Sequence, residues 1–160
     1  MDEWEIIRRY SSELPIDVVS IIRELGISYR EKELASHQSG YFKNTGSGYE
    51  IGVNAKDGKQ RKRFTAAHEL GHYVLHRDLL KAGQHMDRLY NAEARSTPSE
   101  PFTSVHEVQA NRFAGNLLLP AANVRDLFQK GLDPAQLAQA FGVSIPAINI
   151  RLANLGLSSR

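Results

Sequence analysis

The N-terminal third of the chain changes from a helical to an alternating pattern of apolar residues. Apolar positions at helical spacing predict a short amphipathic helix over residues 4–13 and a second helix over residues 16–25. Pro15 suits the first turn of the second helix, and Gly26 suits its end. The pattern then predicts three strands, at residues 27–34, 39–43 and 49–53. The last two flank a loop rich in Asn, Gly and Ser, which indicates a hairpin.

A helix that is apolar around most of its circumference is predicted over residues 61–77. Its apolar side chains are Phe64, Ala66, Ala67, Leu70, Val74 and Leu75. A helix of this kind is buried in the core of a protein. His68, Glu69 and His72 lie on it, and buried polar groups are costly unless other groups compensate them.

The rest of the chain combines a long polar segment with further helices. Residues 78–101 are polar and contain Gly83 and Pro98, which predicts a long loop with a functional role or high mobility. Helical patterns follow at residues 103–118, 121–129, 134–141 and 145–155. We therefore expect one α+β domain, which has N-terminal helices over 1–26, a core over 27–120 and a helical subdomain over 121–160.

The composition restricts the kinds of site that this chain can build. It has 160 residues, 41% of them hydrophobic, and a formal charge of +2, which is too small to indicate nucleic-acid binding by itself. It has no cysteine, so disulfides and thiolate metal sites are excluded. The acidic start and the lack of a long apolar run predict neither a secretory signal nor a membrane span. We expect a cytoplasmic protein.

The chemistry of the chain is concentrated in the motif His68-Glu69-Leu70-Gly71-His72. Histidines four residues apart lie on the same face of a helix, where both can bind one zinc ion at about 2.0–2.1 Å. Glu69 lies about 100° further round the helix, so it can stand beside the metal and accept a proton from zinc-bound water. Because such a short motif can occur by chance, its surroundings must support it.

A catalytic zinc site needs a third protein ligand. His76 continues the spacing, but eight residues of helix place it about 12 Å along the axis from His68, which is too far. A metzincin-type extension would need Gly and His where this chain has Leu75 and Asp78. His76 is therefore interpreted as a packing or hydrogen-bonding residue.

The helix predicted over residues 103–118 offers two better candidates for the third ligand. His106 and Glu107 both border its apolar face, where an unpaired carboxylate would be costly. Asp87 and Glu93 in the polar segment are more typical of solvated surface charges. From the residues alone, Glu107 and His106 both stay open.

Several motifs, in this order, make the chain resemble the ImmA/IrrE-type metallopeptidases of bacteria and their mobile elements. The matching segments are IGVN at 51–54, RFTAAHELGHY at 63–73, EVQANRFA at 107–114 and LLLP at 117–120, with FGVS at 141–144 and LGL at 155–157 near the end. They cover most of the chain from about Tyr41 onward. Where the family often has Met before the proline, this chain has Leu119, which is a volume-conserving change.

The resemblance implies a zincin-like fold and a peptidase activity. It implies that Glu107 is the third metal ligand beside His68 and His72, and that Glu69 is the catalytic base. The cofactor would be Zn²⁺, although two imidazoles and a carboxylate also suit Mn²⁺ and Fe²⁺. An extended substrate could pair with the edge of the strand that ends near Val53 and Asn54.

The resemblance also implies a class of substrate. Members of the family are similar to regulators that cleave a helix-turn-helix repressor, often encoded next to them, in mobile elements, stress responses or toxin–antitoxin loci. The alternative is a zinc-containing regulator that binds a partner protein or DNA without cutting it. The oligomeric state is not predicted.

Two segments favour a possible role in nucleic-acid binding, and both have a simpler interpretation. Residues 138–148 fit a helix-turn-helix pattern, but only Arg151 and Arg160 are cationic after Gly131, so a helical cap on the core is the favoured interpretation. Residues 56–63 form a basic run. Such a run is usually a solvated approach to a helix, and it could alternatively steer an acidic protein substrate.

Overall fold

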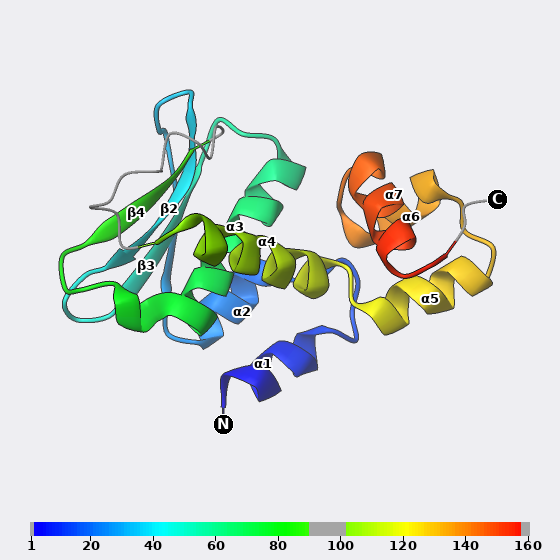
Figure 1. The fold of residues 1–160 in the computed structure, drawn as a ribbon, viewed down its shortest axis with the longest axis horizontal. Helices are drawn as coiled ribbons and strands as arrows, with labels where there is room; N and C mark the ends of the chain where they lie inside the picture. Colours follow the sequence, from blue (N-terminus) through cyan, green and yellow to red (C-terminus); the bar gives the residue numbers. More distant parts are fainter. Residues whose placement is uncertain (1, 90–101, 158–160) are drawn as a thin grey trace.

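The computed structural model describes residues 2–89 and 102–157, which form a mixed α+β structure (Figure 1). Helices α1 (Glu3–Tyr10) and α2 (Val18–Glu24) come first. Asp17 caps α2, because its Oδ1 accepts a hydrogen bond from the backbone N–H of Ser20 at 3.0 Å. The prediction that Pro15 lies in the first turn of this helix is therefore wrong, since Pro15 precedes the cap.

A four-stranded sheet has the order β1-β3-β2-β4. Its strands are β1 (Ser28–Lys32), β2 (Gln38–Asn44), β3 (Tyr49–Asn54) and β4 (His85–Leu89). The predicted hairpin is confirmed, since β2 pairs antiparallel with β3 in a register that sets Phe42 opposite Ile51. β1 runs parallel to β3.

The sheet corrects two predictions. The strand that ends at Asn54 is β3, which pairs with β1 on one side and β2 on the other, so it has no edge to offer to a peptide. The predicted long loop contains β4, which pairs antiparallel with β2 at an edge of the sheet. Its sequence, HMDRL, lacks the strict alternation that signals a strand, and the pairing with β2 decides its conformation. Residues 90–101 of the predicted loop lie outside the described residues.

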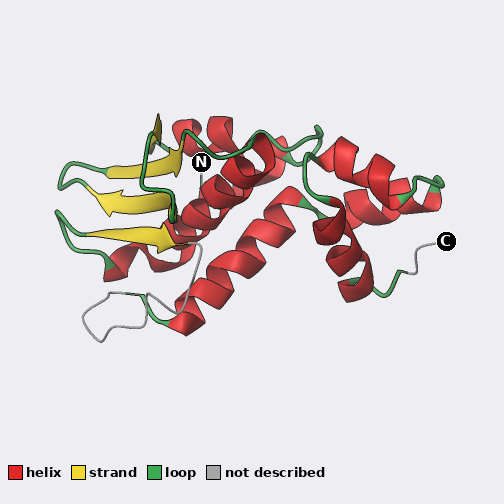
Figure 2. Ribbon diagram, turned by 90° about the horizontal axis from the view of Figure 1, so that it is seen from above, coloured by secondary structure: helices red, strands yellow, loops and turns green. Residues whose placement is uncertain are grey.

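Helix α3 (Lys59–His76) packs against the sheet, and its residues 65–72 are all buried. The prediction of a core helix is thus confirmed. Gly40 of β2 allows the close approach, because a Cβ atom there would lie 2.6 Å from Cγ2 of Thr65. Figure 2 shows the strands on one side of the molecule and the helices beside them.

The prediction that the basic run over residues 56–63 is solvated is wrong for Arg63. This side chain is partly buried. Its guanidinium donates hydrogen bonds to the backbone oxygens of Ile16 (2.8 Å), Phe141 (3.1 Å) and Gly142 (3.1 Å). These bonds attach the start of α3 to the N-terminal and C-terminal helices at once. Backbone carbonyls compensate the buried guanidinium, as such groups require.

A short 3₁₀ turn, η1 (Arg77–Leu79), follows α3, and α4 (Ser104–Leu118) packs along α3. The C-terminal set contains α5 (Ala121–Gln129), α6 (Pro134–Phe141) and α7 (Ile145–Asn154). Helices α4, α5, α6 and α7 agree with the predicted ranges to within one residue. None of the helices in the described part of the chain has the length and apolarity needed to cross a membrane.

Candidate metal centre

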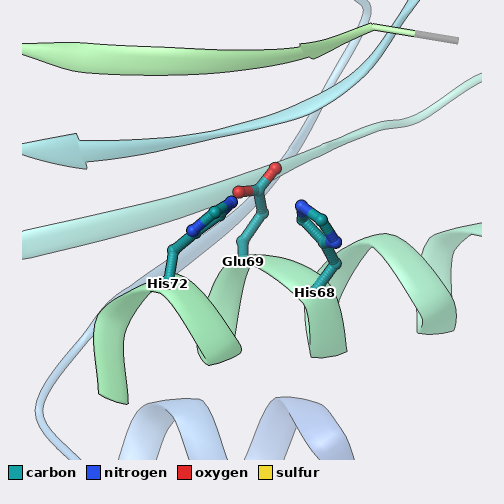
Figure 3. A group of neighbouring side chains, drawn as sticks. All are labelled: His68, Glu69 and His72. Carbon is teal, nitrogen blue, oxygen red and sulfur yellow. The ribbon is translucent and has the colours of Figure 1, made fainter. Parts of the chain in front are cut away.

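His68, Glu69 and His72 project from one side of α3 and lie close together (Figure 3). Ligand atoms of the three side chains lie within 4.8 Å of one another, and all three residues have no exposed surface. The i, i+4 spacing brings the two imidazoles together, as predicted. Figure 3 shows the Glu69 carboxylate between the two rings, on the side that faces away from the helix backbone.

A second carboxylate reaches the same imidazoles from α4. Oε1 of Glu107 lies 3.0 Å from Nε2 of His68, and Oε2 lies 3.3 Å from Nε2 of His72. Glu107 is 8% exposed and occupies the first turn of α4, where the helix dipole favours a negative charge. Four polar side chains from two helices therefore converge at one buried point.

Gly71 explains how α4 comes close enough for this contact. A Cβ atom at this position would lie 3.0–3.2 Å from three atoms of the Phe113 side chain on α4. The missing side chain lets Phe113 rest directly on α3 at Gly71. The glycine inside the motif thus serves the packing of the two helices.

The Nδ1 atoms of both histidines are engaged away from the centre. Nδ1 of His68 lies 2.8 Å from Oδ1 of Asn111. Nδ1 of His72 lies 3.0 Å from Nδ1 of His76, whose Nε2 lies 2.6 Å from Oε1 of Gln109. Asn111 and Gln109 both belong to α4, so one helix supplies Glu107 and the ends of both hydrogen-bond chains.

This network fixes which ring nitrogens carry protons. An amide oxygen only accepts, so His68 donates through Nδ1–H to Asn111, and His76 donates through Nε2–H to Gln109. Burial lowers the pKa of His76, which keeps its ring neutral at neutral pH and leaves its Nδ1 as an acceptor. His72 must then donate through Nδ1–H, so Nε2 is the atom of both His68 and His72 that faces Glu107.

Aromatic packing holds the rings in place. The Phe102 ring stacks on His72, with centroids 4.3 Å apart and an angle of 17° between the planes. His106 lies outside the convergent group, since its Nδ1 accepts a hydrogen bond from the N–H of Thr103 at the start of α4. Its ring contacts that of His76, 4.7 Å away.

The donor set fits a divalent metal ion. Two imidazoles direct their Nε2 atoms toward one carboxylate from the neighbouring helix, and an unprotonated Nε2 offers a lone pair to a metal ion. Buried imidazole and carboxylate groups without cysteine suit zinc in a catalytic rather than a closed structural site. The second ring nitrogen of a metal-bound histidine usually donates a hydrogen bond to a neighbouring acceptor, as Nδ1 of His68 does to Asn111.

Comparison with known families agrees with this geometry. A sequence model of the Peptidase M78 family, described as the IrrE N-terminal-like domain, matches residues 22–153. The chain belongs to this family. The match includes the sheet, the convergent residues on α3 and α4, and nearly all of α7. A peptidase family, together with a buried cluster that could bind a metal, confirms the resemblance seen in the sequence.

A solved structure shares the fold. A Mycobacterium tuberculosis transcriptional regulator superposes with a TM-score of 0.60 at 21% sequence identity. The likeness covers 94% of this chain and 46% of the other, so the chain spans less than half the length of that regulator. At this identity the likeness shows the fold alone. No curated protein matches the sequence.

Sequence reasoning missed the supporting residues of the centre. Asn111 follows Glu107 by four residues, so helical spacing alone places both on one face of α4. Gln109 and Phe102 carry no comparable signal, since their partners lie on α3. The role of His76 agrees with the prediction of a hydrogen-bonding residue.

Proposed function

We propose that this member of the Peptidase M78 family is a zinc-dependent endopeptidase. The observation that carries the proposal is the position of the Glu107 carboxylate, 3.0 and 3.3 Å from the Nε2 atoms of His68 and His72, whose Nδ1 atoms are engaged elsewhere. His68, His72 and Glu107 would hold the metal. Mn²⁺ and Fe²⁺ suit the same groups, so zinc is proposed on the basis of the family.

The bound zinc would polarise the scissile carbonyl and make a water molecule more acidic. Glu69 would be the base that takes the proton from this water, because its carboxylate stands beside both imidazoles. The protonated Glu69 then donates the proton to the leaving amine. Asn111 and His76 hold the histidine rings in orientation throughout.

The substrate that we propose is a helix-turn-helix regulator, encoded near this chain. The support is the resemblance to ImmA/IrrE-type peptidases, whose members act on such proteins. We also place the protein in the cytoplasm, where these substrates are found. Direct DNA binding is disfavoured, because the exposed residues of α7 include no cation; they are Ile145, Pro146, Asn149, Ile150, Ala153 and Asn154.

The proposal is tested with the Glu69→Gln variant. Zinc-loaded wild-type protein and the variant are each incubated with unstructured β-casein and with the helix-turn-helix protein encoded beside it. The variant should keep one zinc per chain and lose hydrolysis by about 10²–10⁴-fold, because only the base is removed. Equal turnover by both proteins would exclude Glu69 as the base. Absence of any cleavage by zinc-loaded wild type would favour the non-proteolytic regulator.

A further inference from the structure

A cleft of about 980 Å³ opens between the start of α3, the second half of α4 and α7. Figure 1 shows these three elements meeting where the core adjoins the C-terminal helices. Two hydrogen bonds hold its walls together: Gln60 donates to the backbone oxygen of Val143 at 3.2 Å, and Arg151 donates to that of Leu119 at 3.0 Å. The volume is at the upper end for pockets that hold drug-sized ligands, so it has room for several side chains of a peptide.

The cleft is strongly one-sided in charge. Its described lining contains the cations Lys59, Arg61, Arg112 and Arg151, and it contains neither Asp nor Glu. Burial and the neighbouring charge of Arg125 lower the pKa of Arg151, as expected where cations gather. A concave surface lined by one sign of charge concentrates ligands of the opposite sign.

Between the cations the lining combines apolar residues with uncharged polar ones. Phe64, Leu118, Val143 and Ile150 contribute side chains, and Ile150 is 63% exposed. Exposed aliphatic groups beside cations suit a peptide that carries carboxylates and apolar side chains together. A lone phosphate or another small anion would leave this apolar surface unused.

The cleft lies on the Nδ1 side of His68, behind the metal centre. Asn111 belongs to its lining and also accepts the hydrogen bond from Nδ1 of His68. Phe64, also in the lining, has its ring centroid 6.3 Å from that of His68. The His68 ring thus lies between the cleft and the metal centre, and we expect residues that flank the scissile bond to extend around this ring into the cleft.

We propose that this cleft binds an acidic, partly apolar segment of the protein substrate that flanks the scissile bond. The inference rests on the proposed peptidase function and adds a substrate preference to it. Duplex DNA is disfavoured as the occupant, because the face of α7 that carries Arg151 is turned toward the peptidase core. A recognition helix needs its reading face open to the major groove.

The proposal is tested by binding, without turnover, on the Glu69→Gln protein. The probes are a short fluorescein-labelled peptide of Glu, Leu and Ser and the same peptide with every Glu replaced by Gln. We expect the acidic peptide to bind about tenfold more tightly in fluorescence anisotropy, since several screened charge pairs act together. Adding Lys59→Glu or Arg112→Glu should each weaken only the acidic peptide, by about threefold to fivefold.

Two controls separate the cleft from general electrostatics. Lys130→Glu makes the same charge change on α5, outside the cleft, and should leave both affinities unchanged. A peptide with Lys in place of Glu should bind the double variant Lys59→Glu/Arg112→Glu more tightly than the Glu69→Gln parent. Lys59→Glu also places a carboxylate at the start of α3, which the helix dipole favours, so lost binding would not reflect unfolding.

The outcomes distinguish this inference from the peptidase proposal. Hydrolysis of β-casein by the wild type, with equal affinities for the two peptides, would overturn the cleft proposal alone. Preference for the acidic peptide with no hydrolysis by zinc-loaded wild type would overturn the peptidase proposal and with it the substrate role of the cleft. Random duplex DNA that binds more tightly than the peptide at physiological salt, and loses affinity in Arg112→Glu, would overturn the cleft proposal in favour of a nucleic-acid site.

Discussion

The candidate metal centre and the cationic cleft are neighbouring regions that differ in how deeply their charged and polar groups are buried. In the centre, His68 and His72 have no exposed surface, and Glu107 touches both. In the cleft, the lining residues Lys59 and Arg112 are exposed. Charges interact far more strongly in a low-dielectric interior than in water. One substitution in the centre should therefore remove a function, whereas one in the cleft should only weaken a preference.

The largest effect is expected from Glu107→Gln. The amide keeps the size of the side chain but removes the charge that faces both Nε2 atoms, so zinc affinity should fall by more than about 100-fold. Competition with a chelating dye measures the affinity. His106→Gln is the matched control on the same turn, and it should bind zinc nearly as the wild type does. Equal losses in the two variants would contradict the assignment of Glu107.

The next effect concerns the hydrogen bonds behind the histidines. Asn111→Leu and His76→Leu remove the acceptors for Nδ1–H of His68 and His72, so each should lower zinc affinity by about 10–100-fold. His76→Gln can still accept from His72, and we expect it to restore most of the affinity. Asn116→Leu changes an exposed amide on α4 in the same way and should have no effect. If His76→Gln were as weak as His76→Leu, the proposed proton arrangement would be wrong.

The third effect concerns the free energy of unfolding. It should differ between a glycine at the contact of α3 with α4 and a glycine outside this contact. Gly71→Ala places a methyl group 3.0–3.2 Å from the Phe113 side chain, which should cost about 1–3 kcal/mol, offset by the roughly 1 kcal/mol that alanine gains over glycine inside a helix. Gly115→Ala on α4 meets no atom within 4 Å and should instead stabilise the protein by about 0.4–1 kcal/mol. Urea unfolding measures both. Destabilisation by Gly115→Ala as large as that by Gly71→Ala would show that close helix contact is not what Gly71 provides.

The smallest effect is expected from a surface ion pair near the start of α3. Lys62 lies 3.0 Å from Glu31 on β1, and this hydrogen bond is the main cause that lowers the pKa of Glu31. A lowered folded-state pKa adds stability that is present above the usual pKa of 4.5 and is lost as the pH falls through the lower, folded value. The exposed pair should contribute about 0.2–1 kcal/mol after solvent screening.

The variant Glu31→Gln tests this contribution. Its free energy of unfolding should lie slightly below that of the wild type at pH 7, and the difference should vanish in strong acid. Urea titrations across the acid range measure the difference. A difference that grows toward low pH would have the wrong sign for a carboxylate with a lowered pKa.

The contrast between the two regions also explains what the sequence could predict. The pair His68 and His72 is a local feature, because helical spacing alone aligns residues four apart. The residues alone left His106 and Glu107 equally possible as the third metal ligand, so the prediction of Glu107 needed the resemblance. The choice between them depends on how α4 approaches α3. Gly71 and Phe113 set that approach, and neither residue signals it in the sequence.

The cleft and the sheet edge were harder to predict for the same reason. The cleft combines three segments that are distant in the chain, and only the basic run before α3 suggested an acidic partner. β4 has a polar sequence whose pairing with β2 overrides its weak pattern. Arg63 looked like part of a solvated run, but three backbone carbonyls from two separate regions surround it. Long-range contacts of this kind leave no periodic signal.

The most direct test of the central claim is a crystal structure of the zinc-loaded protein with anomalous data at the zinc edge. We predict one strong anomalous peak about 2.0–2.2 Å from Nε2 of His68, Nε2 of His72 and a carboxylate oxygen of Glu107, with Glu69 beside it. A peak held by other groups while Glu107 points away, or no peak between these side chains, would contradict the claim.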